Sequence, residues 1–179
     1  MNKKIIFKDY PEFKPNLTPY QIFKSGAFGG TYWRPIYSSI TKKKYKNQYK
    51  KYDWKDISKE YLCSNICDKL KNKYKVNSGT SLEYWEKKGW IHPQDPYGWI
   101  QWYCEFYNGR RTKDDKRQIK RWLNFAGPNG RFRKRLIKLI KINNTKYNDY
   151  QISPIIRQGL LHWAYELTNE DYKYYIKNN

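Results

Sequence analysis

The chain has 179 residues, of which 39% are hydrophobic, 19% are aromatic and 30% are charged. The aromatic content is far too high for a disordered basic tail, and the length predicts one domain whose core needs neither disulfides nor a metal. Lysine and arginine number 37 against 16 acidic residues, which gives a formal net charge of +21. Such a charge favours a polyanion as partner, with nucleic acid first and an anionic membrane surface second.

The positive charge is concentrated in two segments. Residues 31–55 carry eight basic side chains and one acid, and residues 109–142 carry thirteen and two, so together they hold 18 of the 21 net charges. Coding bias in an AT-rich genome raises lysine everywhere but does not explain arginine, and seven of the nine arginines lie between Arg110 and Arg135. Arginine suits bidentate phosphate contacts and stacking on bases. The pattern therefore favours a local binding surface.

Residues 1–53 are expected to form an extended N-terminal arm followed by a basic loop. Three prolines at fourfold spacing disfavour helix, and four aromatic side chains would anchor the arm to the core. They are Pro11, Pro15 and Pro19, with Tyr10, Phe13, Tyr20 and Phe23. Residues 31–38 are rich in strand formers and predict a short edge strand or hairpin.

Lysines and tyrosines alternate over residues 41–52. We interpret this segment either as a solvated loop or as a flexible basic strip that follows a phosphate backbone while its tyrosines stack on exposed bases. The candidate phosphate contacts are Lys43, Lys44 and Lys46, and the candidate stacking residues are Tyr45 and Tyr49.

Residues 54–179 are expected to form a helical domain that makes one globular unit with the arm. Apolar side chains at three- and four-residue steps predict an amphipathic helix from Asp56 to Tyr74. Asp95 and Pro96 predict the start of a helix that ends at Gly109. Further helices are predicted at 81–88, 113–125, 131–142, from 153 onward and at 170–177. The expected fold class is mainly α, a single helical domain of six or seven helices with an irregular aromatic N-terminal arm and one short edge hairpin or strand.

Five large aromatic residues at helical spacing are more typical of a core than of a base-stacking surface. They are Trp99, Trp102, Tyr103, Trp122 and Trp163. Trp102 lies off the main apolar stripe, so we expect it at the surface, where it could stack on a base.

Cys63, Cys67 and Cys104 predict buried free thiols, the first two on the apolar stripe of the 56–74 helix. No Cys and His spacing suits zinc, and no cofactor is predicted. The apolar run near the N-terminus ends at Lys8, too early for a signal peptide, and no stretch is long enough to span a bilayer. We expect an intracellular, reducing compartment, with the nucleus, a viral factory or a virion as candidate locations.

Several motifs resemble one protein family. They are DPYGWIQWYCEFYNGRR at 95–111, DDKRQIKRW at 114–122, GPNGRFRKRLI at 127–137 and SPIIRQGLLHWAYEL at 153–167, with FGGTYWRPIYS and WEKKGW upstream. Through these motifs, residues 28–167 resemble a widespread family of uncharacterised proteins of large DNA viruses, fungi, algae and bacteria. The resemblance implies an intracellular protein, of viral origin given the base composition, and carries over neither a catalytic residue nor a ligand.

The helices predicted at 113–125 and 131–142 are joined by a short Gly-Pro turn and should be spatial neighbours. Their outward sides would form a basic two-helix face over residues 110–141. This face comprises Arg110, Arg111, Arg117, Lys120, Arg131, Lys134, Lys138 and Lys141. Phosphates are the natural counter-surface, so we expect nucleic-acid binding with low sequence specificity, with DNA favoured over RNA. The turn fits a helix-turn-helix motif poorly.

Two alternatives stay open beside this binding role, which is favoured because no catalytic signature accompanies the basic face. One is a nucleic-acid-processing enzyme that uses the face as a substrate platform. Its catalytic candidates are Asp114, Asp115 and Glu166, which could hold a divalent metal, together with His162. Each also has a structural explanation, as a helix-dipole partner or an i, i+4 pair. The other alternative is a structural or virion-associated interaction protein whose basic face meets acidic protein.

Overall fold

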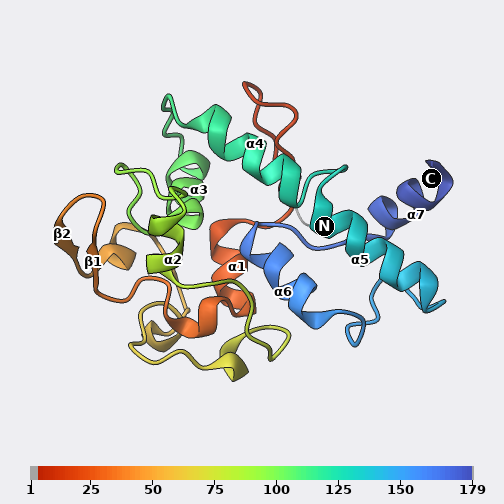
Figure 1. The fold of residues 1–179 in the computed structure, drawn as a ribbon, viewed down its shortest axis with the longest axis horizontal. Helices are drawn as coiled ribbons and strands as arrows, with labels where there is room; N and C mark the ends of the chain where they lie inside the picture. The colour runs from red at the N-terminus through yellow and green to blue at the C-terminus, as the bar shows by residue number, and fades with distance from the viewer. Residues whose placement is uncertain (1–3, 179) are drawn as a thin grey trace.

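The computed structural model describes residues 4–178 and confirms a single, mainly α-helical domain (Figure 1). Seven α-helices lie in this part of the chain: α1 (Pro19–Ser25), α2 (Leu82–Lys87), α3 (Trp99–Tyr107), α4 (Asp115–Phe125), α5 (Arg131–Ile142), α6 (Pro154–His162) and α7 (Asn169–Asn178). One antiparallel hairpin pairs β1 (Ile36–Ser38) with β2 (Lys43–Tyr45). The hairpin and α7 lie at opposite ends of the molecule. No described helix is both long and apolar enough to cross a bilayer.

Caps and breakers place most helices where the sequence predicts them. Helix α2 begins after Ser81, whose hydroxyl accepts a hydrogen bond from the backbone N–H of Tyr84. Helix α6 has Pro154 at its first position, where the missing N–H costs nothing. The turn at residues 127–130 separates α4 from α5. The bounds of these helices therefore lie close to the predicted ones.

Helix α3 starts later than the sequence predicts. It begins at Trp99, after Gly98 with a φ of 89°, and not at Pro96. The Asp95 side chain is fully buried and binds Arg110 instead of capping the helix. A carboxylate removed from water needs a cationic partner, which the partial charge of a helix terminus does not replace.

The prediction of a helix from Asp56 to Tyr74 is wrong. The segment is irregular and contains only two short 3₁₀ helices, at Lys59–Tyr61 and Lys69–Lys71. Its apolar stripe does not form either: Ile66 and Leu70 are 78% and 61% exposed. Cys67 is exposed for the same reason and Cys63 is half-buried, so the predicted burial holds fully for Cys104 alone.

The backbone of this irregular segment pairs with a distant part of the chain. The bonds run from Trp33 N–H to Leu62 O, Ser64 N–H to Gly30 O, Asp68 N–H to Gly29 O and Lys73 N–H to Gly26 O. The two segments approach so closely that a Cβ at Gly26 would lie 2.0 Å from the carbonyl oxygen of Lys71. These long-range bonds use three amides and one carbonyl of the segment that a helix would have paired internally, so the local helical pattern is overridden.

The N-terminal arm is not extended throughout. Helix α1 begins with Pro19. A capping box stabilises its N-terminus, in which Thr18 and Gln21 exchange side-chain and backbone hydrogen bonds. Proline is compatible with a first turn, because the N–H at that position has no acceptor within the helix. The third proline of the arm therefore starts a helix.

The core is a dense cluster of aromatic rings into which the arm inserts Phe13. This side chain is 1% exposed. Its ring neighbours are Phe7, Trp99, Trp102, Tyr103, Phe106 and Trp122, at centroid distances of 5.1 to 6.4 Å. Four of these six contacts are edge to face, an arrangement that adds to the stabilisation that area burial provides. The arm is thus part of the core that supports α3 and α4.

Trp102, which the sequence places at the surface, is fully buried, so its predicted role in base stacking is wrong. Its indole N–H donates a hydrogen bond to Oδ1 of Asp115 at 2.8 Å. A carboxylate inside the domain thereby satisfies the polar atom that often keeps a tryptophan near water. Trp99, Tyr103 and Trp122 are buried as expected.

Replacing Phe13 with alanine should lower the free energy of unfolding by about 3–5 kcal/mol, because the ring fills a space that its neighbours cannot close. Urea denaturation followed by tryptophan fluorescence measures this loss. Ile6→Ala is the control, since Ile6 is 69% exposed and should change stability by about 0.5 kcal/mol or less. Equal, small effects of both variants would show that the core is complete without the arm.

Candidate functional site

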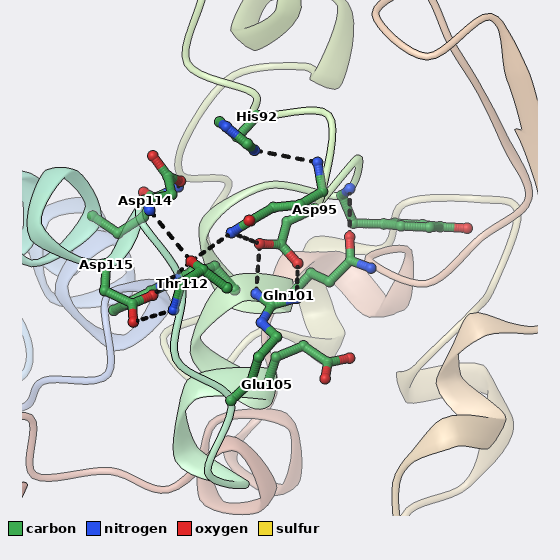
Figure 2. Close-up of polar contacts among 12 residues, drawn as sticks. His92, Asp95, Gln101, Glu105, Thr112, Asp114 and Asp115 are labelled. Carbon is green, nitrogen blue, oxygen red and sulfur yellow. Dashed lines mark hydrogen bonds and ion pairs between the residues drawn. The ribbon is translucent and has the colours of Figure 1, made fainter.

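Asp114 and Asp115, two of the predicted catalytic residues, are engaged at the start of α4 (Figure 2). Asp114 forms an ion pair with Arg117 at 2.5 Å and accepts a hydrogen bond from Gln118 at 2.9 Å. Burial raises the pKa of Asp114, but these two partners outweigh it and the pKa is lowered. Asp115 accepts hydrogen bonds from the backbone N–H of Thr112 and from the indole of Trp102. Both carboxylates therefore have structural partners.

His162 is buried at the end of α6, with its ring stacked on Phe28 at a centroid distance of 3.9 Å. Its Nε2 accepts a hydrogen bond from the Phe28 N–H and lies 3.0 Å from the amide nitrogen of Gln158. Because both neighbours are donors, the proton of the neutral ring is assigned to Nδ1. Burial lowers the pKa of His162 to about 3, which keeps the ring neutral at pH 7.

Glu166 belongs to a third network. Its carboxylate pairs with Lys73 and accepts a hydrogen bond from the Tyr74 hydroxyl at 2.9 Å. Within residues 4–178, no group of three or more His, Cys, Asp and Glu side chains is placed to hold a metal ion. The structure thus leaves the predicted catalytic residues in separate contacts.

An ion pair between the buried Asp95 and the half-buried Arg110 joins the two loops that flank α3 (Figure 2). Arg110 donates to both carboxylate oxygens of Asp95, at 2.8 and 2.6 Å, and the Gln94 amide donates to one of them at 2.9 Å. Burial raises the pKa of Asp95, and the Arg110 hydrogen bonds oppose this rise. Arg110, predicted to contact phosphate, is instead engaged by the fold.

The network continues from this ion pair to α4. The Gln94 amide also donates to the Thr112 hydroxyl at 3.2 Å, and that hydroxyl donates to Asp115 at 3.0 Å (Figure 2). The contacts therefore link the loop before α3 to the first residue of α4. They set the position of α4, which carries part of the predicted basic face.

Only part of the predicted basic face is free of ion pairs. Besides Arg110, Arg117 pairs with Asp114, and Arg111 pairs with Asp9 while its guanidinium lies 3.8 Å from the Phe106 ring centre. The remaining five cations form no ion pair within residues 4–178, and all are exposed except the half-buried Lys134. They are Lys120, Arg131, Lys134, Lys138 and Lys141.

The basic strip at 41–52 forms the end of the hairpin and a 3₁₀ turn. Lys43, Lys44 and Lys46 are exposed. Tyr45 and Tyr49, by contrast, are half-buried and pack against the core. The lysines are accessible to a phosphate backbone, whereas the two tyrosines proposed for base stacking have much of their surface covered by the fold.

A cleft of about 760 Å³ lies between α2 on one side and helices α4, α5 and α6 on the other. Its size is within the range of ligand-binding pockets, about 300–1,000 Å³. A second hollow, of about 970 Å³, adjoins it and shares Phe28, Tyr32 and Trp85 in its lining. We call the first of these the aromatic cleft.

One wall of the aromatic cleft is a continuous series of ring contacts. Phe132 of α5 lies 4.2 Å from Phe125 of α4, and Phe125 lies nearly parallel to Trp163 at 4.8 Å. Trp163 in turn lies 4.8 Å from Trp99 of α3. Phe125, Phe132 and Trp163 are only half-buried, so part of each ring remains accessible.

The opposite wall consists of α2 and the turn after it. Tyr84 and Trp90 meet edge to face at 5.7 Å and are 42% and 41% exposed. Trp85 is half-buried, with its indole N–H donating to the Thr80 hydroxyl at 2.7 Å. Large exposed rings gathered on a concave surface are typical of a binding site.

Arg121 of α4 bridges the two walls. Its guanidinium lies 5.9 Å from the ring centre of Trp90 and 5.3 Å from that of Trp163, and it donates hydrogen bonds to the Trp90 carbonyl and to Gln118. No carboxylate among residues 4–178 forms an ion pair with it. Burial lowers the pKa of Arg121 to about 10, so it is charged at pH 7. A half-buried cation without an acid is a natural partner for an anion.

Arg121 is the candidate that reasoning from the sequence missed. It lies three residues after Gln118 and four before Phe125, so all three share one side of α4. That spacing places Arg121 at the border between the buried and the exposed face, and this is the signal by which it could have been found. Trp90 lies in a turn and carries no periodic signal.

Phe28 lines both hollows and has an unusual backbone conformation. Its φ is 55°, in the left-handed region that costs a residue with a Cβ roughly 1–2 kcal/mol. The stacking on His162 and the hydrogen bond from its own N–H to that ring hold it there.

Comparison of the chain with protein-family models, with curated proteins and with solved structures finds no match.

Arg110→Ala should destabilise the protein by about 3–5 kcal/mol, because it leaves the Asp95 carboxylate buried without a counter-charge. Denaturation in guanidinium chloride measures the loss. Lys24→Ala is the control, since the Lys24–Asp56 pair is exposed and should contribute little to stability. If Arg110→Ala were as mild as the control, Arg110 would be free to contact a ligand.

Stability should fall on acidification because of His162. Its folded-state pKa, about 3, lies below the ordinary value of 6.5, so the unfolded chain binds the proton first. The contribution is fully present above about pH 6.5 and is lost as the pH falls toward 3, with roughly 2 kcal/mol lost by pH 5. Urea denaturation at pH 7.5 and pH 5 measures this, and His162→Asn should flatten the dependence. Parallel curves for both proteins would exclude His162 as the cause.

Proposed function

We propose that this protein binds nucleic acid and contacts its phosphates through cations on α4 and α5. The observation that carries the proposal is the set of five side chains without an ion pair in the described structure: Lys120, Arg131, Lys134, Lys138 and Lys141. Exposed cations that the fold does not neutralise are available to a polyanion. The net charge of +21 would also attract such a ligand over a distance.

Four of these cations form a row along α5. They are Arg131, Lys134, Lys138 and Lys141, at spacings of three, four and three residues, which places them on one side of the helix. The row is about 15 Å long at the rise of an α-helix. The opposite side of α5 packs Leu136, Ile137 and Ile140 into the core, so the helix presents its charges from a fixed support.

Another ion pair fixes α5 from its far side. Arg133 is buried, pairs with Asp171 of α7 at 2.6 Å and lies over the Tyr165 ring at 4.7 Å. Arg133 therefore supports the helix and is not counted among the phosphate contacts.

We infer low sequence specificity, because a lysine meets a phosphate as a compact point charge and phosphates carry no sequence information. Lys43, Lys44 and Lys46 of the hairpin are exposed and could assist as a second contact region. Since the proposed contacts are to phosphates, which DNA and RNA share, DNA is kept as the first partner to test and RNA as the second.

The triple variant Lys134→Ala, Lys138→Ala and Lys141→Ala should weaken binding to a labelled duplex without changing the helical circular dichroism spectrum. For the wild type we expect a log–log dependence of affinity on salt with a slope near −5, and the variant should reduce the steepness by about 2 to 3. Fluorescence anisotropy titrations at several salt concentrations measure both.

The matched control is Lys146→Ala, Lys173→Ala and Lys177→Ala, which removes the same charge from exposed positions outside the α5 row. It should have the smaller effect. Absence of binding to any nucleic acid, or binding that ignores salt, would refute the proposed function. Equal effects of the two triple variants would leave net charge, and not the α5 row, as the cause.

A further inference from the structure

We propose that the aromatic cleft binds an unpaired base of single-stranded nucleic acid, with Arg121 and Arg131 holding the adjoining phosphate. This inference rests on the proposed function and specifies its ligand. It assigns a role to the aromatic rings of the cleft and to Arg121 between them. The phosphate contacts on α5 do not require either feature.

The shape and chemistry of the cleft suit a nucleobase. Accessible aromatic rings face it from both sides, with Trp90 and Tyr84 on one wall and Phe132 and Trp163 on the other. Every base has a flat π-face, and stacking on aromatic side chains is how proteins bind single strands with little sequence preference. The volume of about 760 Å³ is ample for one base with its sugar.

The charge in the cleft argues against a purely apolar occupant. Arg121 lies between the walls without a carboxylate partner in the described chain, and Arg131, also in the lining, has its guanidinium 4.7 Å from the Phe132 ring centre. An apolar ligand would cover these two cations and leave them without an anion, which is unfavourable. A nucleotide places an anion next to a flat ring, so it satisfies both features.

The cleft is continuous with the α5 row because Arg131 belongs to both. A strand whose phosphates follow Lys141, Lys138 and Lys134 would therefore arrive at Arg131 with its next base beside the rings. One strand can therefore contact the α5 row and the aromatic cleft at the same time.

The lining also offers polar groups for the edge of a base. His162 lines the cleft, and with two donors at Nε2 its proton is on Nδ1, for which the described residues provide no acceptor. Asn124 and Ser78 lie in the same lining. A paired base cannot reach such a site without leaving the duplex, so the cleft should favour single strands.

The test compares three labelled probes of equal length: oligothymidylate, a duplex, and a single strand whose bases are replaced by abasic sites. Wild-type protein should bind oligothymidylate more tightly than the abasic strand. Trp90→Ala should weaken oligothymidylate binding by roughly 5- to 150-fold and should affect the abasic strand and the duplex little. Because Trp90 is 41% exposed, the variant should fold normally, which circular dichroism and its melting temperature check.

Two further variants separate the cleft from general effects. Tyr174→Ala removes a ring that is 68% exposed on α7, away from the cleft lining, and should bind like the wild type. Arg121→Gln should weaken oligothymidylate binding and reduce the steepness of its salt dependence by about 1, whereas Arg121→Lys, which keeps the charge, should recover that dependence.

The outcomes distinguish this inference from the proposed function. If no probe binds, both the proposed function and the base site are refuted. If all probes bind with salt dependence, but the abasic strand binds as tightly as oligothymidylate and Trp90→Ala changes nothing, phosphate binding stands and the base site is refuted. Equal weakening of all three probes by Trp90→Ala also overturns the base site, because Trp90 would then act only by positioning α4.

Discussion

The ion pair between the buried Asp95 and the half-buried Arg110 is the constraint on which the rest of the structure depends. The Asp95 carboxylate cannot remain charged in the interior without Arg110, so the loops before and after α3 must meet. Through Gln94 and Thr112 the same contacts reach the first residue of α4. Helix α5 follows α4 after a short turn, so the positions of the cationic row and of the ring-lined wall both depend on this pair. Arg110, which the arginine-rich composition suggests for phosphate binding, instead stabilises the fold that positions the residues free to bind a phosphate.

Local signals made much of the fold predictable from the sequence. The cap at Ser81, the proline at 154 and the Gly-Pro turn at 127–130 act within a few residues, and the helices near them were predicted correctly. The irregular structure of residues 56–74 has no such local signal, because three of its amides, those of Ser64, Asp68 and Lys73, bond to carbonyls between residues 26 and 30. The burial of Trp102 escapes prediction for a related reason: Asp115, thirteen residues away, accepts its indole N–H, and no apolar periodicity encodes that hydrogen bond.

The candidate site divides in the same way. The free lysines of α5 could be predicted from helical spacing. The sequence does not tell which arginines pair with acids and which are free, since Arg111 pairs with Asp9 across 102 residues. A guanidinium fork fits carboxylates as well as phosphates, so an arginine-rich segment can serve as a network of ion pairs or as a binding surface. The ring-lined cleft joins residues from several helices and a turn, and therefore has no signature in the order of the chain.

Phe28, in the lining of this cleft, is held in a fixed conformation. Its backbone occupies a conformation that a phenylalanine does not adopt freely, and both its ring and its N–H are held by His162. A residue kept in such a conformation has no nearby alternative into which it can relax while its neighbours stay in place. The entropy of ordering Phe28 is therefore lost when the chain folds and not when a ligand arrives. At Phe28 the cleft is preorganised, and a ligand meets this part of the lining in a conformation already fixed.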